Sequence, residues 1–385
     1  MLERISLAIG VSAIRCWLSM PPLRTMGNVS ALQKMPVSPP QLALLLALSG
    51  PIATAAADSR EGLFYQHRDW VVACDNTRTC RAAGYSGSNA SPLSVLLTRS
   101  GGPNQAVQGR LALHPDEGRT QPNEVLNLRI QEQDLGILAP DTVPGMYSLS
   151  ATQTSALLSA MVGDGGIMVT DASDQRWPLS DKGASAVLLK IDEYQGRLGT
   201  PGAMLRTGRS PEASVPAALP IPVIRKASTL DAMSEDPAFA TTAASPALRA
   251  ALLATLKEPR CEGLLAASPD LPISNSPLKV QRLDARHLIV SVPCWRAASN
   301  DGDGYWVIRE QPPYLPIWVT NDAYRYEGGQ IFAYARGLGP IDCTSEYTWT
   351  WDGTRFIHTS AIEGVICAQT PDGIWKLPTR ISEVH

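Results

Sequence analysis

Residues 346–362 read EYTWTWDGTRFIHTSAI, which is two runs of aromatic and β-branched residues on either side of Asp352-Gly353. Such residues favour strands, and Asp-Gly between two strands is a strong signal for a tight hairpin turn. We therefore expect one strand over residues 346–351 and a second, antiparallel strand over residues 355–362. This hairpin predicts that the C-terminal part of the chain is an antiparallel sheet.

Strand-like runs recur at regular spacing around this hairpin, which is typical of an antiparallel meander. The further runs are residues 278–282, 287–292, 305–309, 314–320, 330–336 and 373–377. A helix precedes them and should run to about Glu258, because Ser245 is a good N-cap and Pro246 suits the first helical position.

The N-terminal half mixes strands with helices. Its strand-like runs are residues 64–74, 93–98, 124–131 and 167–170. Residues 156–161 place apolar side chains at helical spacing, and Gly163 provides a stop. Residues 183–197 have the pattern of an amphipathic helix, which we expect to close the N-terminal domain.

The chain is expected to be α+β and β-rich. It should have two domains of antiparallel sheet or sandwich type, each with one or two packed helices. Residues 206–244 are rich in Pro, Ala and Ser, and proline opposes helix continuation and sheet pairing, so this segment is interpreted as a linker. The expected organisation is a leader at 1–57, an N-terminal domain at 58–205, the linker at 206–244 and a C-terminal domain of a helix and a β-meander at 245–385.

Residues 41–57 have the pattern of a signal peptide. A short apolar run at 41–48 is followed by Ser-Gly-Pro and then by three alanines at 55–57, so we expect cleavage near Asp58 and a periplasmic protein. A start at Met20 or Met26 would leave a leader of more usual length. The apolar run is shorter than the roughly 20 residues of a membrane helix, and no integral membrane segment is expected in the mature chain.

Six of the seven cysteines follow this leader, and an even number in an exported protein indicates disulfides. Sequence alone leaves many pairings open. We choose the sequential set because two of its pairs flank turns and the third links the end of a helix to the sheet. The expected pairs are Cys74 with Cys80, Cys261 with Cys294, and Cys343 with Cys367.

Several motifs resemble those of a known family. They are Asp69-Trp70, Cys74-Asp75-Asn76 and Cys80; Gly183-Ala184, Asp192 and Gln195-Gly196-Arg197; Gly337, Gly339 and Asp342-Cys343; and Trp351-Asp352-Gly353 with Phe356 and Cys367. On these motifs the chain resembles the DUF1176 family of exported bacterial proteins, which has six cysteines and no agreed function. The N-terminal motif more loosely resembles the invasion-associated locus B proteins. The family resemblance implies that the helix at 183–197 packs on a sheet.

Composition and motifs exclude several function classes. The formal net charge is −3 and there is no polybasic run, so nucleic acid is a poor candidate partner. The chain has no nucleotide-binding glycine motif, no Gly-x-Ser-x-Gly elbow after a strand and no metal-binding arrangement among its five histidines. We therefore predict no cofactor and assign no catalytic residue. His67 with Asp69 is interpreted as an exposed strand start rather than an acid/base pair.

Residues 299–310 contain a candidate calcium-binding pattern. Asp301, Asp303 and Glu310 fall at positions 3, 5 and 12 of an EF-hand-like loop, although Ser299 stands where Asp belongs. A polar hairpin turn is the favoured interpretation of residues 299–304. The motif cluster at Asp192 and Arg197 is likewise assigned a structural role at a helix end.

These observations favour a binding or interaction protein of the cell envelope over an enzyme, with an unknown envelope protein or cell-wall component as partner. A narrower form of this hypothesis is an inhibitor of an envelope hydrolase. The alternative is a hydrolase of peptidoglycan or another envelope glycan, with carboxylates such as Asp301, Asp303 or Asp342 in a Trp-lined cleft. Most of the nine tryptophans lie in the C-terminal third, where burial is favoured over a binding role.

Overall fold

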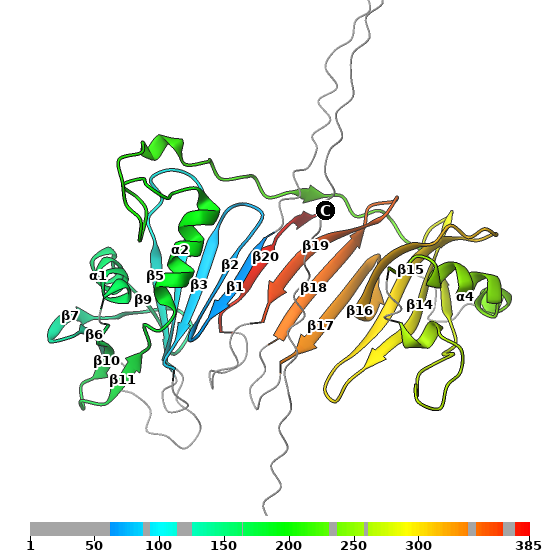
Figure 1. The fold of residues 1–385 in the computed structure, drawn as a ribbon, viewed down its shortest axis with the longest axis horizontal. Coiled ribbons are helices and arrows are strands. Elements are labelled where there is room, and N and C mark those ends of the chain that lie inside the picture. The colour runs from blue at the N-terminus through cyan, green and yellow to red at the C-terminus, as the bar shows by residue number, and fades with distance from the viewer. Residues whose placement is uncertain are drawn as a thin grey trace, which may run out of the picture. The chain divides into compact units, whose positions relative to one another are not determined.

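The computed structural model describes most of the chain after the leader. The described residues are 62–87, 93–113, 125–163, 165–230, 237–257, 261–337, 344–364 and 374–385. They form an eight-stranded, a seven-stranded, a four-stranded and a two-stranded sheet, together with a few short helices (Figure 1). The prediction of an α+β, β-rich fold is therefore confirmed.

The eight-stranded sheet is an antiparallel meander in which neighbouring strands follow one another along the chain. Its strands are β13 (Lys279–Arg282), β14 (His287–Arg296), β15 (Asp301–Arg309), β16 (Ile317–Glu327), β17 (Gln330–Arg336), β18 (Thr344–Trp351), β19 (Phe356–Glu363) and β20 (Leu377–Arg380). The expected hairpin is confirmed as β18 and β19. At its turn Gly353 has a φ of 96°, and the Asp352 carboxylate accepts the backbone N–H groups of Thr354 and Arg355 at 2.7 and 2.8 Å.

Helix α4 (Pro246–Leu253) covers one face of the first strands of this sheet. Its start is as predicted, because the Ser245 hydroxyl accepts the backbone N–H of Leu248 at 3.3 Å. Its buried side chains pack against Trp306 of β15, whose indole N–H donates to the Thr255 hydroxyl at 2.9 Å. The helix ends earlier than the expected Glu258.

Two disulfides of the sequential set are formed. Cys74 and Cys80 are register partners across neighbouring strands, and Cys261 is joined to Cys294 on β14. In both pairs the Cα atoms are 3.9 Å apart. The expected third pair, Cys343 with Cys367, lies outside the described residues.

The seven-stranded sheet is covered on both faces. Its strands, in spatial order, are β1 (Leu63–His67), β2 (Trp70–Cys74), β3 (Cys80–Tyr85), β4 (Leu93–Arg99), β5 (Gln108–Leu113), β9 (Met146–Ser148) and β8 (Ala139–Pro140). Every residue of β2 is buried as a result. Trp375 and Leu377, from the C-terminal end of the chain, pack on one face, and the Trp375 indole N–H donates to the Ser94 hydroxyl at 2.9 Å.

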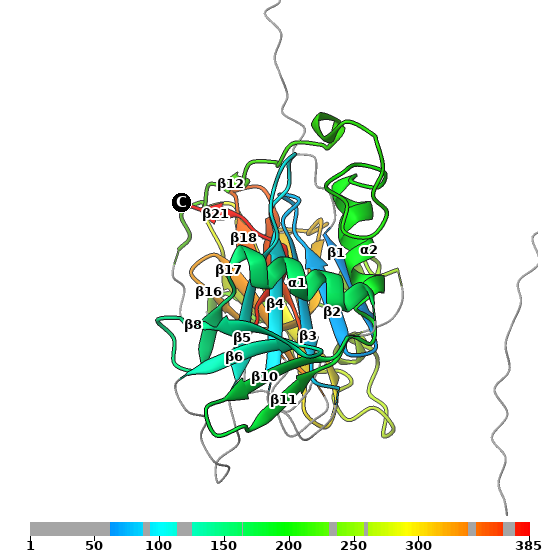
Figure 2. The same cartoon turned by 90° about the vertical axis from the view of Figure 1, so that its left-hand side faces the viewer.

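The opposite face of this sheet packs against two helices and the four-stranded sheet. These elements are α1 (Ala151–Val162), α2 (Ala184–Gln195), β11 (Arg176–Leu179), β10 (Ile167–Asp171), β6 (Leu126–Ile130) and β7 (Gln133–Ile137). Figure 2 shows α1 and the small sheet as a separate layer in front of the seven-stranded sheet. A capping box of Ser150 and Gln153 starts α1, and α2 ends at Gly196, whose φ is 69°.

The segment interpreted as a linker contains short regular elements. They are η1 (Glu212–Ser214), β12 (Val223–Ile224), η2 (Pro237–Phe239) and α3 (Ala240–Ala243). Strand β12 pairs in parallel with β21 (Glu383–Val384), so it lies beside the C-terminus (Figure 1). The backbone N–H groups of Ala227 and Leu230 donate to the carbonyls of Trp351 and Leu283 at 2.9 and 3.0 Å. This proline-rich segment is therefore tied to the eight-stranded sheet by backbone hydrogen bonds.

The polar turn predicted at residues 299–304 is wrong in position. Asp301 already begins β15. The turn lies at residues 297–300, where the Ala297 N–H donates to the Asn300 carbonyl at 2.8 Å. Gly302 and Gly304 lie within this strand, and aromatic rings over them leave no room for a side chain. A Cβ atom on Gly302 would meet the Trp295 indole at 2.4 Å, and one on Gly304 would meet the Trp306 ring at the same distance.

Candidate functional site

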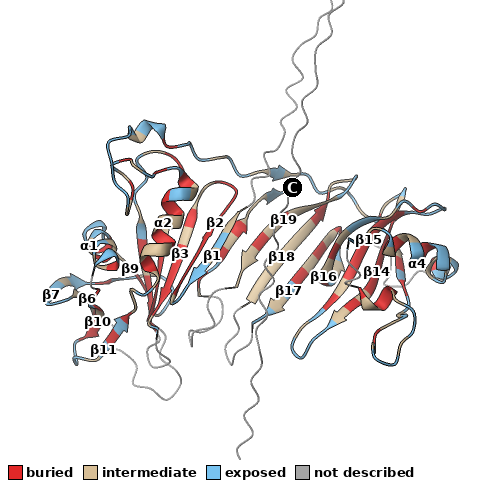
Figure 3. Cartoon of the chain, viewed as in Figure 1, coloured by how far each residue is buried: buried red, intermediate tan, exposed pale blue. Residues whose placement is uncertain are grey.

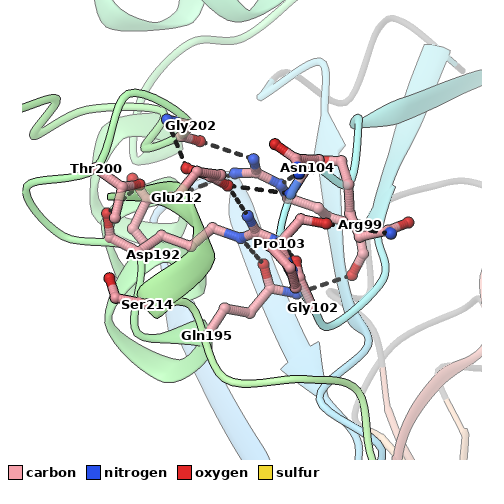
Figure 4. A network of polar contacts seen from close by, with 12 residues as sticks. Arg99, Gly102, Pro103, Asn104, Asp192, Gln195, Thr200, Gly202, Glu212 and Ser214 are labelled. Atoms are coloured by element: carbon pink, nitrogen blue, oxygen red, sulfur yellow. Dashed lines mark hydrogen bonds and ion pairs between the residues drawn. The ribbon is translucent and has the colours of Figure 1, made fainter. Parts of the chain in front are cut away.

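The cluster at the end of α2 forms a buried polar network (Figure 4). The Arg197 side chain is fully buried, and its Nε donates to Gln195 Oε1 at 2.9 Å while Nη1 donates to Glu212 Oε1 at 2.8 Å. Its Nη2 donates to the carbonyls of Ser100 and Gly102. The Gln195 amide in turn donates to two further backbone carbonyls, at 2.9 Å each. Arg197 therefore links the end of α2 to two loops.

Asp192 and Arg99 extend this network. Arg99 Nη1 lies 3.6 Å from Asp192 Oδ1, and Asp192 Oδ2 accepts the backbone N–H groups of Met204 and Leu205 at 2.7 and 3.1 Å. Burial raises the pKa of Asp192. Burial, together with the charge of Arg197, lowers the pKa of Arg99 to about 10. With Glu212 included, two acids balance two arginines.

A recess of about 440 Å³ lies beside Arg99, between α1 and the loop that contains Gly202. Arg99 does not extend freely into it, because Nε donates to the Gln105 carbonyl at 2.9 Å and Nη2 to the Gly202 carbonyl at 2.7 Å. The donors and acceptors of this cluster thus form hydrogen bonds with backbone groups of the protein's own loops. This geometry favours the structural role that we expected for the motif.

The carboxylates considered for calcium do not converge. Asp301 and Asp303 lie at the start of β15 and Glu310 follows its end, so the strand separates Asp301 from Glu310 by roughly 30 Å. Ligand oxygens must lie within about 2.6 Å of a calcium ion. Glu310 instead pairs with Arg282 at 3.0 Å. Across the described parts of the chain, no group of three or more His, Cys, Asp or Glu side chains is placed to hold a metal ion.

The positions of Asp301 and Asp303 also test the hydrolase alternative, which needs carboxylates in a cleft. Asp301 and Asp303 line neither the recess beside Arg99 nor the recess of about 620 Å³ at the end of the eight-stranded sheet. Burial raises the pKa of Asp303. Asp342 lies outside the described residues. Asp301 and Asp303 therefore do not support this alternative.

His67 and Asp69 are not arranged as an acid/base pair. His67 is exposed on β1, whereas Asp69 accepts the Ser180 hydroxyl at 2.5 Å. Ser180 also accepts the Trp70 indole N–H through its carbonyl, at 2.8 Å. Asp69 thus holds the start of β2 against the end of β11.

His358 on β19 is half-buried and stacks on Trp349, with ring centroids 4.8 Å apart. Among the described residues its Nε2 has no hydrogen-bond partner. Burial, assisted by the positive charge of Arg380, lowers the pKa of His358 from 6.5 to about 4. The folded protein therefore holds this imidazole in its neutral form.

This environment predicts acid sensitivity. Between pH 6.5 and about 4 the unfolded chain binds a proton at His358 that the folded protein does not, so the free energy of unfolding falls as the pH falls through this window. The variant His358→Gln is expected to flatten this dependence. Urea denaturation of both proteins at pH 7, 5.5 and 4.5 measures it. Parallel pH profiles would contradict the prediction.

An open aromatic surface lies on β16 and β17. Trp318 of β16 is the register partner of Trp306 on β15, so both point to the same face of the sheet. Under α4 Trp306 is fully buried, whereas Trp318 is 47% exposed. Tyr324 and Tyr334 continue this surface at 49% and 39% exposure, with ring centroids 6.4 Å apart. Figure 3 shows the change from mostly buried β14 and β15 to the more exposed strands beyond them.

Arg325 completes this surface. Its guanidinium lies 4.6 Å from the Phe332 ring centroid and 5.5 Å from that of Tyr324. We call Trp318, Tyr324, Arg325, Phe332 and Tyr334 the aromatic face. Ala323 and Ile331, on the same strands, point to the opposite side and into the core. Sequence reasoning missed this surface because composition indicated burial for the tryptophans. The alternation of Phe332 with Tyr334 was the available signal. On β16 a register shift places Tyr326 against the core on the other face, so the spacing of Tyr324 and Tyr326 does not indicate the surface.

The fold and these sites define a β-rich, disulfide-bonded protein with an internal polar network and one open aromatic face. The DUF1176 family model, described as a protein of unknown function, matches residues 64–382. This chain therefore belongs to the DUF1176 family. It is similar to the uncharacterized protein YpfG of Escherichia coli strain K12, at 24% identity over 313 residues, which covers 75% of this chain and 84% of the relative. No solved structure matches the chain.

Proposed function

We propose that this protein is an exported, periplasmic binding protein of the cell envelope, and that the aromatic face contacts its partner. The observation behind this proposal is the contrast between Trp306 and Trp318, register partners of which one is covered by α4 and the other is 47% exposed. Tyrosine, tryptophan and arginine are the side chains enriched in binding interfaces. The aromatic face consists of these residue types and is exposed, so it has the composition of a contact surface.

Two further features support the periplasm as the compartment. The disulfides Cys74–Cys80 and Cys261–Cys294 would persist in an oxidising environment. The pattern at residues 41–57 is that of a cleavable signal peptide. Among the described helices, none is long and apolar enough to cross a membrane.

The partner is expected to be an envelope protein or a cell-wall component. A photoactivatable amino acid at position 324 should give one discrete product when cells are irradiated, visible either as a protein band or as material retained on isolated peptidoglycan. Replacing Trp318 and Tyr334 with alanine in the same protein should lower the yield of this product at least about tenfold, because interface aromatics carry most of the binding energy.

The control is a crosslinker at Phe64, which is 40% exposed on β1 and lies outside the aromatic face. Equal labelling from positions 64 and 324, or a yield unaffected by the two alanines, would refute this role for the aromatic face. If the product is an envelope hydrolase, an assay of that enzyme with the purified protein tests the narrower inhibitor hypothesis.

A further inference from the structure

A second recess lies where three connections of the eight-stranded sheet meet. Its volume is about 620 Å³, and it is lined by Arg286 and His287 at the β13–β14 turn, residues 309–313 after β15, and residues 353–354 at the β18–β19 turn. The sheet curls so that Trp351, at the end of β18, donates its indole N–H to Asp284 Oδ2 at 3.2 Å. The recess is therefore built from segments that are distant in the sequence.

His287 is held in one orientation beside this recess. Its Nδ1 lies 2.9 and 3.0 Å from the two carboxylate oxygens of Asp284, and its ring packs edge-on against Trp351 with centroids 5.2 Å apart. Asp284 is itself fixed by the backbone N–H groups of Arg286 and His287, both at 2.8 Å. Because Nδ1 is engaged by Asp284, Nε2 is the ring nitrogen left to meet a ligand.

The charge at the recess is positive. Arg286 and Arg309 are both exposed, and within the described residues neither guanidinium has an ion pair or a hydrogen bond. The remaining charged side chain of the lining, Glu310, is already paired with Arg282 at 3.0 Å. The nearby Asp284 carboxylate is engaged by His287, so within the described residues the two guanidinium groups on adjacent connections have no carboxylate of their own.

We propose that this recess binds the phosphate monoester group of a ligand, with Arg286 and Arg309 pairing with its oxygens and the protonated His287 imidazole donating from Nε2 as a third contact. A phosphate monoester has close to two negative charges near neutral pH, which matches the two uncompensated arginines, whereas a monocarboxylate would neutralise one. Arginine also presents the paired donors that phosphate oxygens accept. The recess is much larger than a phosphate group, so the ligand has a further body that fills it.

Titration of the purified protein with inorganic phosphate and with glycerol phosphate tests this proposal. The imidazole signal of His287 in an NMR spectrum, assigned by its loss in His287→Gln, should shift saturably with either probe. Arg286→Gln and Arg309→Gln should each weaken the binding about tenfold, because each removes a charge-assisted contact. Asp284→Asn should also weaken it through the orientation of His287, without removing a positive charge.

Arg296→Gln is the matched control, because it removes an exposed arginine from the opposite end of β14 and should leave the binding unchanged. Flotation with vesicles of phosphatidic acid, compared with phosphatidylcholine alone, distinguishes a lipid headgroup from a free phosphate ester as the source. An equal response to sodium chloride at matched ionic strength would overturn the proposal. So would stronger binding of acetate than of phosphate, or wild-type affinity in both arginine variants.

The recess at Arg286, His287 and Arg309 shares no residue with the aromatic face. A variant with alanine at Trp318, Tyr324 and Tyr334 should bind phosphate as the wild type does. Failure of one proposal therefore leaves the other standing, and the two sets of variants tell them apart.

Discussion

The variant Arg197→Met is expected to lower the free energy of unfolding by about 3 kcal/mol, because breaking a buried ion pair leaves its other member without a partner. Methionine fills a similar volume but donates no hydrogen bond. Gln195 Oε1, the Gly102 carbonyl and Glu212 Oε1 would each lose a donor. We expect a loss at the lower end of the range for buried ion pairs, because the Glu212 side chain is still 17% exposed to solvent.

Urea denaturation at neutral pH measures this loss. Arg176→Met is a matched control: Arg176 also pairs with a carboxylate, Asp174 at 2.9 Å, but its side chain is 60% exposed. Solvent screens such a pair, so this variant should unfold as the wild type does. A loss in Arg197→Met no greater than in the control would contradict the structural role of the network. Arg197→Lys should be destabilised as well. The lysine ammonium keeps the positive charge, but it lacks the planar guanidinium whose several donors reach all the acceptors of the network.

Removal of the Cys261–Cys294 disulfide is expected to have the other large effect. On the chain-entropy model a crosslink between residues 33 apart stabilises by about 3.7 kcal/mol. The Cys74–Cys80 crosslink, between residues 6 apart, stabilises by about 2.2 kcal/mol on the same model. The difference arises because the longer loop has more conformational freedom when the unfolded chain is not crosslinked.

The two double variants, Cys261→Ala/Cys294→Ala and Cys74→Ala/Cys80→Ala, control for each other. All four side chains are buried and both pairs have the same Cα separation of 3.9 Å, so the packing changes are similar. Denaturant midpoints under non-reducing conditions give the two losses. If Cys74–Cys80 proves the more important crosslink, the loop-entropy explanation fails and native-state packing must dominate.

Local patterns predicted most individual elements. The Asp352-Gly353 turn and the Ser245 cap depend on interactions between residues near one another in the chain, and both lie where they were expected. The misplaced turn at residues 299–304 shows the limit of this reasoning. Glycine and aspartate favour turns, which suggested a turn here. Glycine is instead needed at 302 and 304 because the rings of Trp295 and Trp306 lie over the backbone at these positions, a contact that the local sequence does not reveal.

The candidate sites were predicted less well. The Asp192–Arg197 cluster was found because it matches a motif of the family, although its partners Arg99 and Glu212 come from other segments. His287 was expected only as the first residue of the strand 287–292, with Asp284 just before it, and nothing local indicated that Trp351 and Arg309 would meet them. The aromatic face was missed because the same residue types form cores and binding surfaces.

Composition and local pattern were enough to establish a β-rich chain, the positions of most strands and helices, and membership of the DUF1176 family, because strand alternation, turns and caps depend on neighbouring residues. Tertiary structure alone decided which aromatic side chains are buried. Trp306 and Trp318 are alike in residue type and lie on paired strands, and they differ because α4 covers only the first. It also decided that β12 pairs with β21 and that the sheet curls until Trp351 reaches Asp284. Such contacts join residues far apart in the chain, and their free energy depends on where the whole fold places them.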